Sequence, residues 1–399
     1  MIPDVRRILL AQGLRAFAYG FVSVILGVSL EQRGWSSAQV GILLGAVVAG
    51  TALMSVVVGT FGDRMGRRRL YGLLFLGLAA SGLIFALADY IWLLLLLALT
   101  GTLSTEVVES GPFTSLEQAM LAGAAEGPAR PRIFGIYNAV ATLAGSAGAL
   151  AAGGPELLRR LWGGAPADTR FLLILVPVGL AGALVAASLS QGVDGRTRGR
   201  GSAPLQRSRA TVLRLSGLFA LDSFGGGFVV QTFIAYWFRL RFGASLEMLG
   251  LIFFGIGLIQ SASFLLATRL AEHIGLLNTM VFTHLPPNLL LALIPFAPNL
   301  SLAVALLLAR FALSQMDVPT RQAYVVALVD EQERTAAAGY TNTARYVVRP
   351  LGPVLAGASL RVATSLPFLL GGGIKAIYDL VLWAWFRRVR LSADDRSRK

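Results

Sequence analysis

Long apolar runs, separated by short polar stretches, recur along the whole chain. The runs Ile91–Ala98 and Leu289–Phe296 are almost unbroken, whereas a strand of a membrane barrel alternates apolar and polar positions. About 20 apolar residues allow an α-helix to cross a bilayer. The pattern therefore predicts twelve membrane-spanning helices, at residues 8–31, 38–61, 70–88, 91–121, 133–155, 170–190, 213–238, 247–269, 275–295, 298–325, 336–360 and 366–387.

One long polar stretch divides these spans into two sets of six. Residues 191–212 are rich in Gly, Ser and Arg and have no apolar periodicity, which is typical of a flexible linker. We therefore expect a bundle at 1–190, a linker at 191–212, a second bundle at 213–387 and a tail at 388–399. Lys and Arg concentrate on the side that holds the N-terminus, so the positive-inside rule places both termini and the linker in the cytoplasm.

Composition excludes several classes of protein. Of the 399 residues, 55% are hydrophobic and 14% are charged, against about 25% charged in a soluble protein. The net charge is +14, and the basic residues lie in short loops between apolar runs. We therefore expect no nucleic-acid partner. With no cysteine, thiol catalysis and Cys-ligated metals are excluded. No phosphate loop or dinucleotide fingerprint occurs, and we expect neither an enzyme nor a cofactor.

The two halves carry an internal repeat. A shift of 204 residues aligns 117–153 with 321–357 without a gap, and eight positions are identical, Gly148 and Gly352 among them. Because the shift covers an even number of spans, both halves have the same topology. We expect a pseudo-twofold axis along the membrane normal and a binding site between the halves near the midplane.

The loop after the second span carries a motif of glycines and charged residues. Its key positions are Gly59, Asp63, Arg64, Gly66, Arg67 and Arg68. Gly66 permits a tight turn, and Asp63 can accept from the first amides of the next helix. The arginines can face anionic headgroups. With this motif, twelve spans and a long central loop, the chain resembles the major facilitator superfamily.

The resemblance implies an all-α integral membrane fold of two pseudo-symmetric six-helix bundles and a secondary transporter that works by alternating access. It also implies a cytoplasmic gate, in which Asp63 and its arginines pair with span eleven. The alternative is that these arginines only hold the loop inside. Residues 145–154 are similar to a motif of the family's drug antiporters, although Ala149 and Leu150 replace its Gly-Pro pair. We therefore favour export of a small amphipathic or anionic compound, with uptake of a polar metabolite as the alternative.

Charges inside spans are costly and usually functional. In span four, Glu106, Glu109 and Glu117 share one helical stripe, and in span ten Arg310, Asp317 and Arg321 do the same. Glu106 and Glu109 would repel each other in a low dielectric, so we expect one of them to carry a proton. The alternative is a structural ion pair of Glu106 with Arg15 or Arg310. Glu117 and Arg321 lie nearer the cytoplasmic end and are expected to join the gate.

The remaining intramembrane charges extend these predictions. Arg345 and Arg349 share a face of span eleven ahead of helix-breaking Pro350; Arg345 is expected at the gate. Arg349 could bind an anion or pair with Asp63 or Asp317. Asp222 precedes three glycines on span seven, where discontinuous helices commonly form ion or substrate sites.

Three residues of the outer spans receive structural interpretations. Lys375 and Asp379, at i and i+4, are expected to neutralise each other. His284, which precedes two prolines, is expected to make a hydrogen bond at a kink. The expected partners of the whole chain are a small-molecule substrate, protons and the lipid bilayer of a bacterial plasma or inner membrane, with the protein acting as a monomer. A non-transporting receptor is a further alternative.

Overall fold

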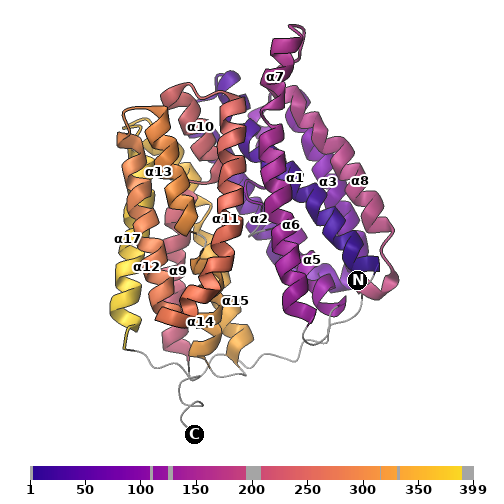
Figure 1. Ribbon diagram of the computed structural model, residues 1–399. Coiled ribbons are helices and arrows are strands. Elements are labelled where there is room, and N and C mark those ends of the chain that lie inside the picture. The colour runs from indigo at the N-terminus through magenta and orange to yellow at the C-terminus, as the bar shows by residue number, and fades with distance from the viewer. Residues whose placement is uncertain are drawn as a thin grey trace. The chain divides into compact units, whose positions relative to one another are not determined.

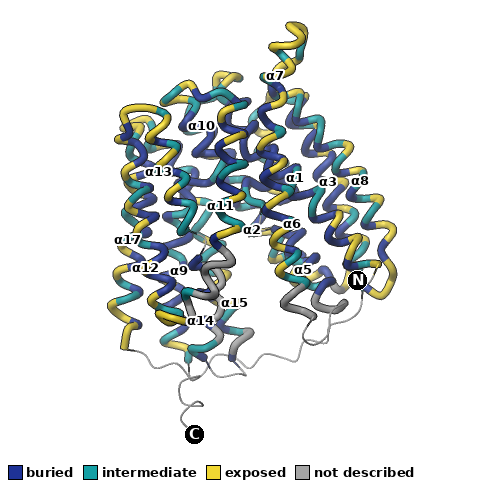
Figure 2. The backbone as a smooth tube through the Cα atoms, viewed as in Figure 1, coloured by how far each residue is buried: buried dark blue, intermediate teal, exposed yellow. Residues whose placement is uncertain are grey.

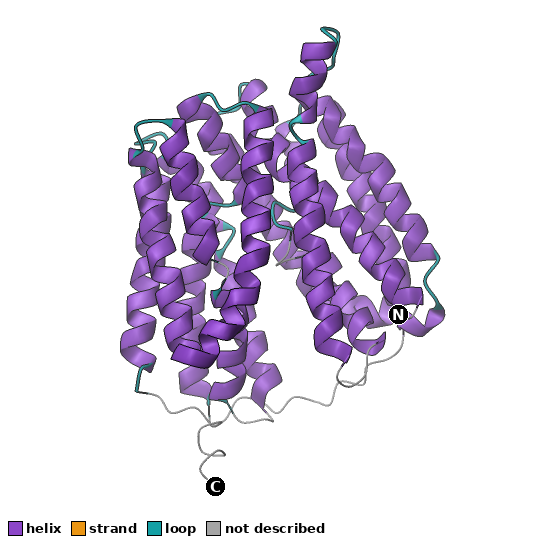
Figure 3. Cartoon of the chain, viewed as in Figure 1, coloured by secondary structure: helices purple, strands orange, loops and turns teal. Residues whose placement is uncertain are grey.

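The computed structural model describes residues 3–107, 111–124, 129–194, 208–314, 316–329 and 333–388. These residues form α-helices, three short 3-10 helices and loops, and no strand occurs among them (Figures 1 and 3). The α-helices are α1 Pro3–Gln32, α2 Ser37–Met65, α3 Arg67–Leu87, α4 Ile91–Ala98, α5 Pro112–Ala124, α6 Ala129–Ala151, α7 Gly154–Leu161, α8 Leu175–Ala187, α9 Arg209–Gly227, α10 Gln231–Phe242, α11 Leu246–Ile274, α12 Leu276–Leu293, α13 Leu300–Leu313, α14 Asp317–Leu328, α15 Arg334–Val348, α16 Leu351–Ser359 and α17 Leu366–Phe386. The 3-10 helices are η1 Asp168–Ile174, η2 Gln191–Asp194 and η3 Ile294–Phe296.

The helices carry their apolar residues outward as well as inward. Nine stretches of the described residues are long and apolar enough to cross a membrane. On α17, Ile377 and Leu380 are 56% and 55% exposed, whereas Lys375 and Asp379 are buried. Figure 2 shows the exposed faces running along the helices. Apolar side chains facing outward and charges facing inward suit a helix surrounded by lipid.

The chain divides into two compact units. Unit 1 comprises the described residues of Met1–Thr197 and Val230–Leu258, and unit 2 those of Arg198–Val229 and Ile259–Lys399. Helix α10 belongs to unit 1 because it packs on α1, where Gln231 Nε2 donates to Ser23 Oγ at 2.8 Å. Residues 230–258 thus group with unit 1, although the sequence-based boundary assigns them to the second bundle. The division into bundles at 190 and 213 stays a prediction.

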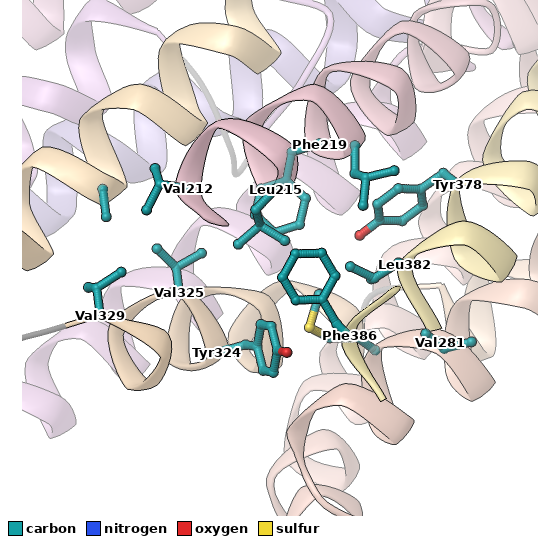
Figure 4. Packing of buried hydrophobic residues seen from close by; sticks show 13 residues of the cluster. Val212, Leu215, Phe219, Val281, Tyr324, Val325, Val329, Tyr378, Leu382 and Phe386 are labelled. Carbon is teal, nitrogen blue, oxygen red and sulfur yellow. The ribbon is translucent and has the colours of Figure 1, made fainter. Parts of the chain in front are cut away.

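Unit 2 has an apolar core built from five of its helices and the segment that follows α14. Phe219 of α9, Tyr324 of α14 and Tyr378 of α17 are 2% exposed or less. Figure 4 shows Phe386 between Tyr324 and Leu382, with Val281 of α12 beside them. This cluster fixes α9, α12, α14, α15 and α17 against one another, and α9, α12, α14 and α17 also carry the residues of the polar network described below.

Span four is interrupted, contrary to the expected continuous helix over 91–121. Helix α4 ends at Ala98 and α5 begins at Pro112, and the described residues between them are not helical. Gly101 has φ 66°, and a Cβ there would lie 2.5 Å from Gly50 O. The chain therefore leaves helical geometry at a glycine that meets the backbone of α2.

Spans seven, ten and eleven are also interrupted. Helix α9 ends at Gly227 and α10 begins at Gln231, as the three glycines indicated. Helix α15 ends before Arg349-Pro350, as predicted from the proline, and α13 and α14 are separate helices. A Cβ on Gly227 would lie 2.5 Å from Arg349 O, and one on Gly352 would meet the Gly227 backbone. The interruptions of spans seven and eleven therefore meet at a glycine contact.

The repeat predicted from the sequence has a matching packing role in each half. Gly148 on α6 meets the Phe17 backbone of α1, and Gly352 on α16 meets the Gly227 backbone of α9. The 204-residue shift aligns these two glycines. Both lie where a later helix of the half meets its first helix without room for a side chain.

Candidate functional site

A buried ion pair lies at the centre of unit 1. Arg15 on α1 and Glu117 on α5 have side chains 1% and 0% exposed, and the guanidinium holds the carboxylate through Nε at 3.1 Å and Nη2 at 2.8 Å. Tyr71 and Tyr137 donate their hydroxyls to the same carboxylate at 2.8 and 2.7 Å. Glu117 thus accepts four hydrogen bonds, which satisfy both of its oxygens.

Aromatic rings enclose this pair. Phe113 makes edge contacts with Tyr71 and Phe75, with ring centroids 6.0 and 4.9 Å apart. The Arg15 guanidinium lies 5.3 Å from the Tyr19 ring centroid, within cation–π range. A desolvated pair with matched charges and four hydrogen bonds is suited to hold α1, α3, α5 and α6 together.

Unit 2 contains a larger polar network centred on Asp222 of α9. Lys375 Nζ on α17 donates to Asp222 Oδ1 at 2.5 Å. Arg321 Nη1 on α14 lies 3.5 Å from Asp222 Oδ2 and 3.1 Å from Asp317 Oδ2. Asp317 begins α14, where a carboxylate also favours the helix dipole. One buried arginine therefore joins two carboxylates from different helices.

The network continues to α12. His284 Nδ1 lies 2.8 Å from Asp379 Oδ1, and Asn288 Nδ2 donates to Asp379 Oδ2 at 2.9 Å. His284 Nε2 lies 3.7 Å from Asp222 Oδ1. The side chains of His284, Asp222 and Asp379 are each 5% exposed or less. Three carboxylates, two permanent cations and one imidazole thus form a continuous buried set in unit 2.

The structure brings together some of the residues selected from the sequence. Asp222, Asp317 and Arg321 contact one another in unit 2, and Arg15 contacts Glu117 in unit 1. The suggested pairing of Arg15 with Glu106 is therefore not seen. Glu106 lies in the non-helical stretch after α4, half-buried, with its amide donating to Ser104 Oγ at 3.1 Å. Glu109 lies outside the described residues.

Two predicted roles within unit 2 change. Lys375 pairs with Asp222 on another helix instead of with Asp379, four residues later on its own helix. Asp379 is bound by His284 and Asn288, so the His284 hydrogen bond is part of a charged network. Sequence spacing identifies partners on the same helix only; the signal that could have found this network was six ionisable residues on four separate spans.

A family model described as Major Facilitator Superfamily matches residues 8–353. The chain belongs to this superfamily. It is 26% identical over 426 residues to an uncharacterized membrane protein of Saccharomyces cerevisiae, YJR124C, covering 96% of this chain and 94% of the yeast protein.

Solved transporters of this superfamily share the fold. A bacterial homolog of the human lysosomal transporter Spinster matches with a TM-score of 0.74 at 16% identity, over 97% of this chain and 98% of its own. The nucleoside transporter NupG matches with a TM-score of 0.74 at 14% identity, over 97% of this chain and 100% of its own. The xylose transporter XylE from E. coli matches with 0.70 at 13% identity, over 96% of each chain. These likenesses confirm the all-helical superfamily fold, and membership supports membrane transport as the activity.

The loop motif of the superfamily forms the turn that the sequence predicted. Helix α2 ends at Met65, Gly66 has φ 83°, and α3 begins at Arg67. Arg67 Nη1 donates to Ala119 O at 3.3 Å and Arg68 Nη1 to Leu189 O at 3.1 Å. These arginines therefore bind carbonyls of unit 1 instead of only facing headgroups.

A carboxylate of η2, in the stretch predicted as a linker, accepts from an amide of α3. The Arg68 amide donates to Asp194 Oδ1 at 2.8 Å, the interaction that the sequence assigned to Asp63. The Asp63 side chain lies outside the described part. Arg64 is exposed, with its guanidinium 5.9 Å from the Phe61 ring centroid. The gate role of this motif and of Arg345 stays a prediction.

Arg310 differs from Arg321, the other buried arginine among the described residues of unit 2. It is 8% exposed, and its Nε and Nη1 have no hydrogen-bond partner among the described residues. Its guanidinium stacks 4.6 Å from the Phe311 ring centroid. A desolvated cation of this kind is suited to bind an anion. Arg349 lies at the interruption of span eleven, as the C-cap of α15.

Proposed function

We propose that the protein is a proton-coupled secondary transporter that moves a small molecule by alternating access. The supporting observation is the buried network of unit 2, in which three carboxylates, two permanent cations and an imidazole lie within an apolar bundle. Each buried charge is expensive in a membrane, and such groups mark ion and proton pathways. Membership of the superfamily and interruptions in spans four, seven, ten and eleven support the same conclusion.

Export of a small amphipathic or anionic compound is the direction we favour. The partial antiporter motif at 145–154 and the buried guanidinium of Arg310 support it. Uptake of a polar metabolite is the alternative. We further propose that the protein works as a monomer in a plasma or inner membrane with both termini in the cytoplasm, and that the loop at 59–68 closes a gate there with Glu117, Arg321 and Arg345.

The test uses purified protein in vesicles that contain a pH-sensitive dye. Tetraphenylphosphonium, benzoate, uridine and xylose are added outside in turn, so that a cation, an anion, a nucleoside and a sugar are compared. Proton exchange against the compound makes the lumen more alkaline, whereas cotransport makes it more acidic. The sign of the dye response therefore separates export by antiport from uptake by symport.

Matched variants locate the coupling. Glu106→Gln removes a carboxylate predicted to carry a proton, and Glu247→Gln removes an exposed carboxylate that pairs with Arg160 at 2.9 Å. A lost dye response in Glu106→Gln would assign the coupling to Glu106, and a wild-type response would exclude it. We expect the wild-type dye response in Glu247→Gln. Compound entry without any proton movement in the wild type would replace this proposal with facilitated diffusion.

A further inference from the structure

The inference concerns His284, which lies between two carboxylates from different helices of unit 2. Nδ1 is 2.8 Å from Asp379 Oδ1 on α17, and Nε2 is 3.7 Å from Asp222 Oδ1 on α9. Tyr378 covers the ring edge-on, with ring centroids 5.9 Å apart. Both imidazole nitrogens thus face acidic oxygens in a desolvated setting.

The Asp379 contact fixes the tautomer of the neutral ring. A carboxylate can only accept, so Nδ1 carries a hydrogen and donates it to Asp379. Asn288 Nδ2 lies 3.2 Å from Nδ1, but an amide NH2 group also only donates, and it has its acceptor in Asp379 Oδ2. In the neutral ring, Nε2 therefore carries a lone pair 3.7 Å from Asp222 Oδ1, and two electron-rich groups lie close together.

A proton on Nε2 removes this conflict. The ring then donates from Nδ1 to Asp379 and presents a positive charge to Asp222, whose Oδ1 lies 3.7 Å from Nε2. We propose that His284 is a proton-binding site of unit 2, at which Nε2 takes up one proton and holds it against Asp222. This deepens the proposed function, since it assigns the coupling proton to His284 instead of to Glu106.

Both carboxylates and permanent cations surround the ring. The carboxylates are Asp222 on α9, Asp317 on α14 and Asp379 on α17, and the cations in ion-pair contact with them are Arg321 on α14 and Lys375 on α17. Arg345 on α15 acts on Asp222 as a further cation. The three carboxylates are thus matched by three permanent cations, and it is the position of the two ring nitrogens that favours a bound proton.

Protonation also adds an attraction between α12 and α9. Lys375 Nζ and His284 Nε2 both face Asp222 Oδ1, and a carboxylate oxygen has two lone pairs, so it can accept from both groups. The bound proton therefore attracts α12 to α9 beside the existing link of α9 to α17. A single proton thereby changes the forces between two helices of unit 2.

The binding itself is measured without a substrate. The chain has two histidines, and His273 is exposed, so the His273→Gln variant leaves His284 as the one imidazole. The full-length variant, labelled with 15N-histidine in lipid nanodiscs, is followed by NMR. We expect the Nδ1–H tautomer at high pH and a ring protonated on both nitrogens as the pH falls from about 8 to 5. In Asp222→Asn the change moves to lower pH, because the proton loses the carboxylate it faces.

Two outcomes would overturn the assignment: a ring that stays neutral throughout this range, or a neutral ring with the hydrogen on Nε2. In vesicles, His284→Gln should lose the dye response to a transported compound yet keep exchange of labelled for unlabelled compound, whereas His273→Gln keeps both. A full dye response in His284→Gln overturns the coupling role. If the wild type moves no protons with any compound, the proposed coupling fails while the NMR result still decides whether His284 binds a proton.

Discussion

Arg15 holds Glu117 through two parallel hydrogen bonds of 3.1 and 2.8 Å, in a setting where both side chains are almost fully buried. This pair balances its own charge, and each oxygen of Glu117 has a further tyrosine donor. In unit 2, the imidazole of His284 instead lies between two carboxylates, with Nε2 3.7 Å from Asp222 Oδ1. The two units therefore differ in what a proton can do: in unit 1 it would break a satisfied pair, and in unit 2 an imidazole can bind it.

Removing one partner of the unit 1 pair is expected to destabilise the protein strongly. Glu117→Gln leaves Arg15 buried without a counter-charge, which costs about 3–5 kcal/mol in the free energy of unfolding. Unfolding in mixed micelles, followed by tryptophan fluorescence, measures the loss. Glu247→Gln, which breaks an exposed pair, should cost less than about 1 kcal/mol. Similar values for the two variants would contradict the structural role assigned to the pair.

A double-mutant cycle distinguishes the two possible partners of Lys375. Asp222→Asn combined with Lys375→Met should show a coupling energy of about 1–3 kcal/mol, as expected for groups in contact. Lys375→Met combined with Asp379→Asn should show a much smaller coupling, because Asp379 is bound by His284 and Asn288. The same unfolding assay gives both values. A larger coupling for Lys375 with Asp379 would restore the intrahelical pair predicted from the sequence.

The glycine contact in unit 2 should not tolerate a methyl group. Gly352→Ala places a Cβ against the Gly227 backbone, which cannot move aside as a flexible side chain would. We expect a fall in melting temperature and in transport. Gly217→Ala in α9 is the control, because a Cβ there meets nothing within 4 Å. In a helix interior it should be neutral or stabilise by about 0.4–1 kcal/mol. Equal stability of the two variants would refute the contact.

Asp194 should stabilise the start of α3 through its side-chain oxygen. Asp194→Ala removes the acceptor of the Arg68 amide and should cost about 0.5–2 kcal/mol, as loss of a helix cap does. Asp194→Asn keeps an oxygen in the same place and should cost much less. Thermal unfolding of the two variants provides the comparison, and an equal loss in both would show that charge, not the hydrogen bond, is what matters.

Arg310 should lower the stability of the protein while contributing to the binding of an anion. Arg310→Met removes a buried cation whose Nε and Nη1 have no partner among the described residues, so we expect the variant to gain about 1–3 kcal/mol in stability. If the guanidinium binds an anion, the same variant loses the dye response to benzoate. A less stable variant with full benzoate response would assign Arg310 to packing alone.

The sequence predicted the helical membrane fold because long apolar runs and a repeat leave few alternatives. It also placed the turn at Gly66 and the interruption at Pro350, where single residues determine the backbone. The interruption after Ala98 was missed, because it depends on a tertiary contact, that of Gly101 with the α2 backbone. The apolar run in the sequence gives no sign of this contact. The polar residues 100–106 were the available signal.

The candidate site was predicted less completely, for a similar reason. Asp222, Asp317 and Arg321 could be selected as isolated charges in apolar spans. Lys375 and His284 were assigned to local interactions, because a sequence displays neighbours one turn away but not those on another helix. Their partners lie 153 and 95 positions distant in the chain.

The separation of Asp222 from Lys375 also bears on biosynthesis. At ribosomal rates of about 5–20 residues per second, the 153 residues between them take roughly 8–30 s to synthesise. Throughout that interval, the carboxylate of α9 is without its lysine, which follows on α17. Premature termination before α17 would leave a buried carboxylate without its closest cation, which is costly inside a membrane.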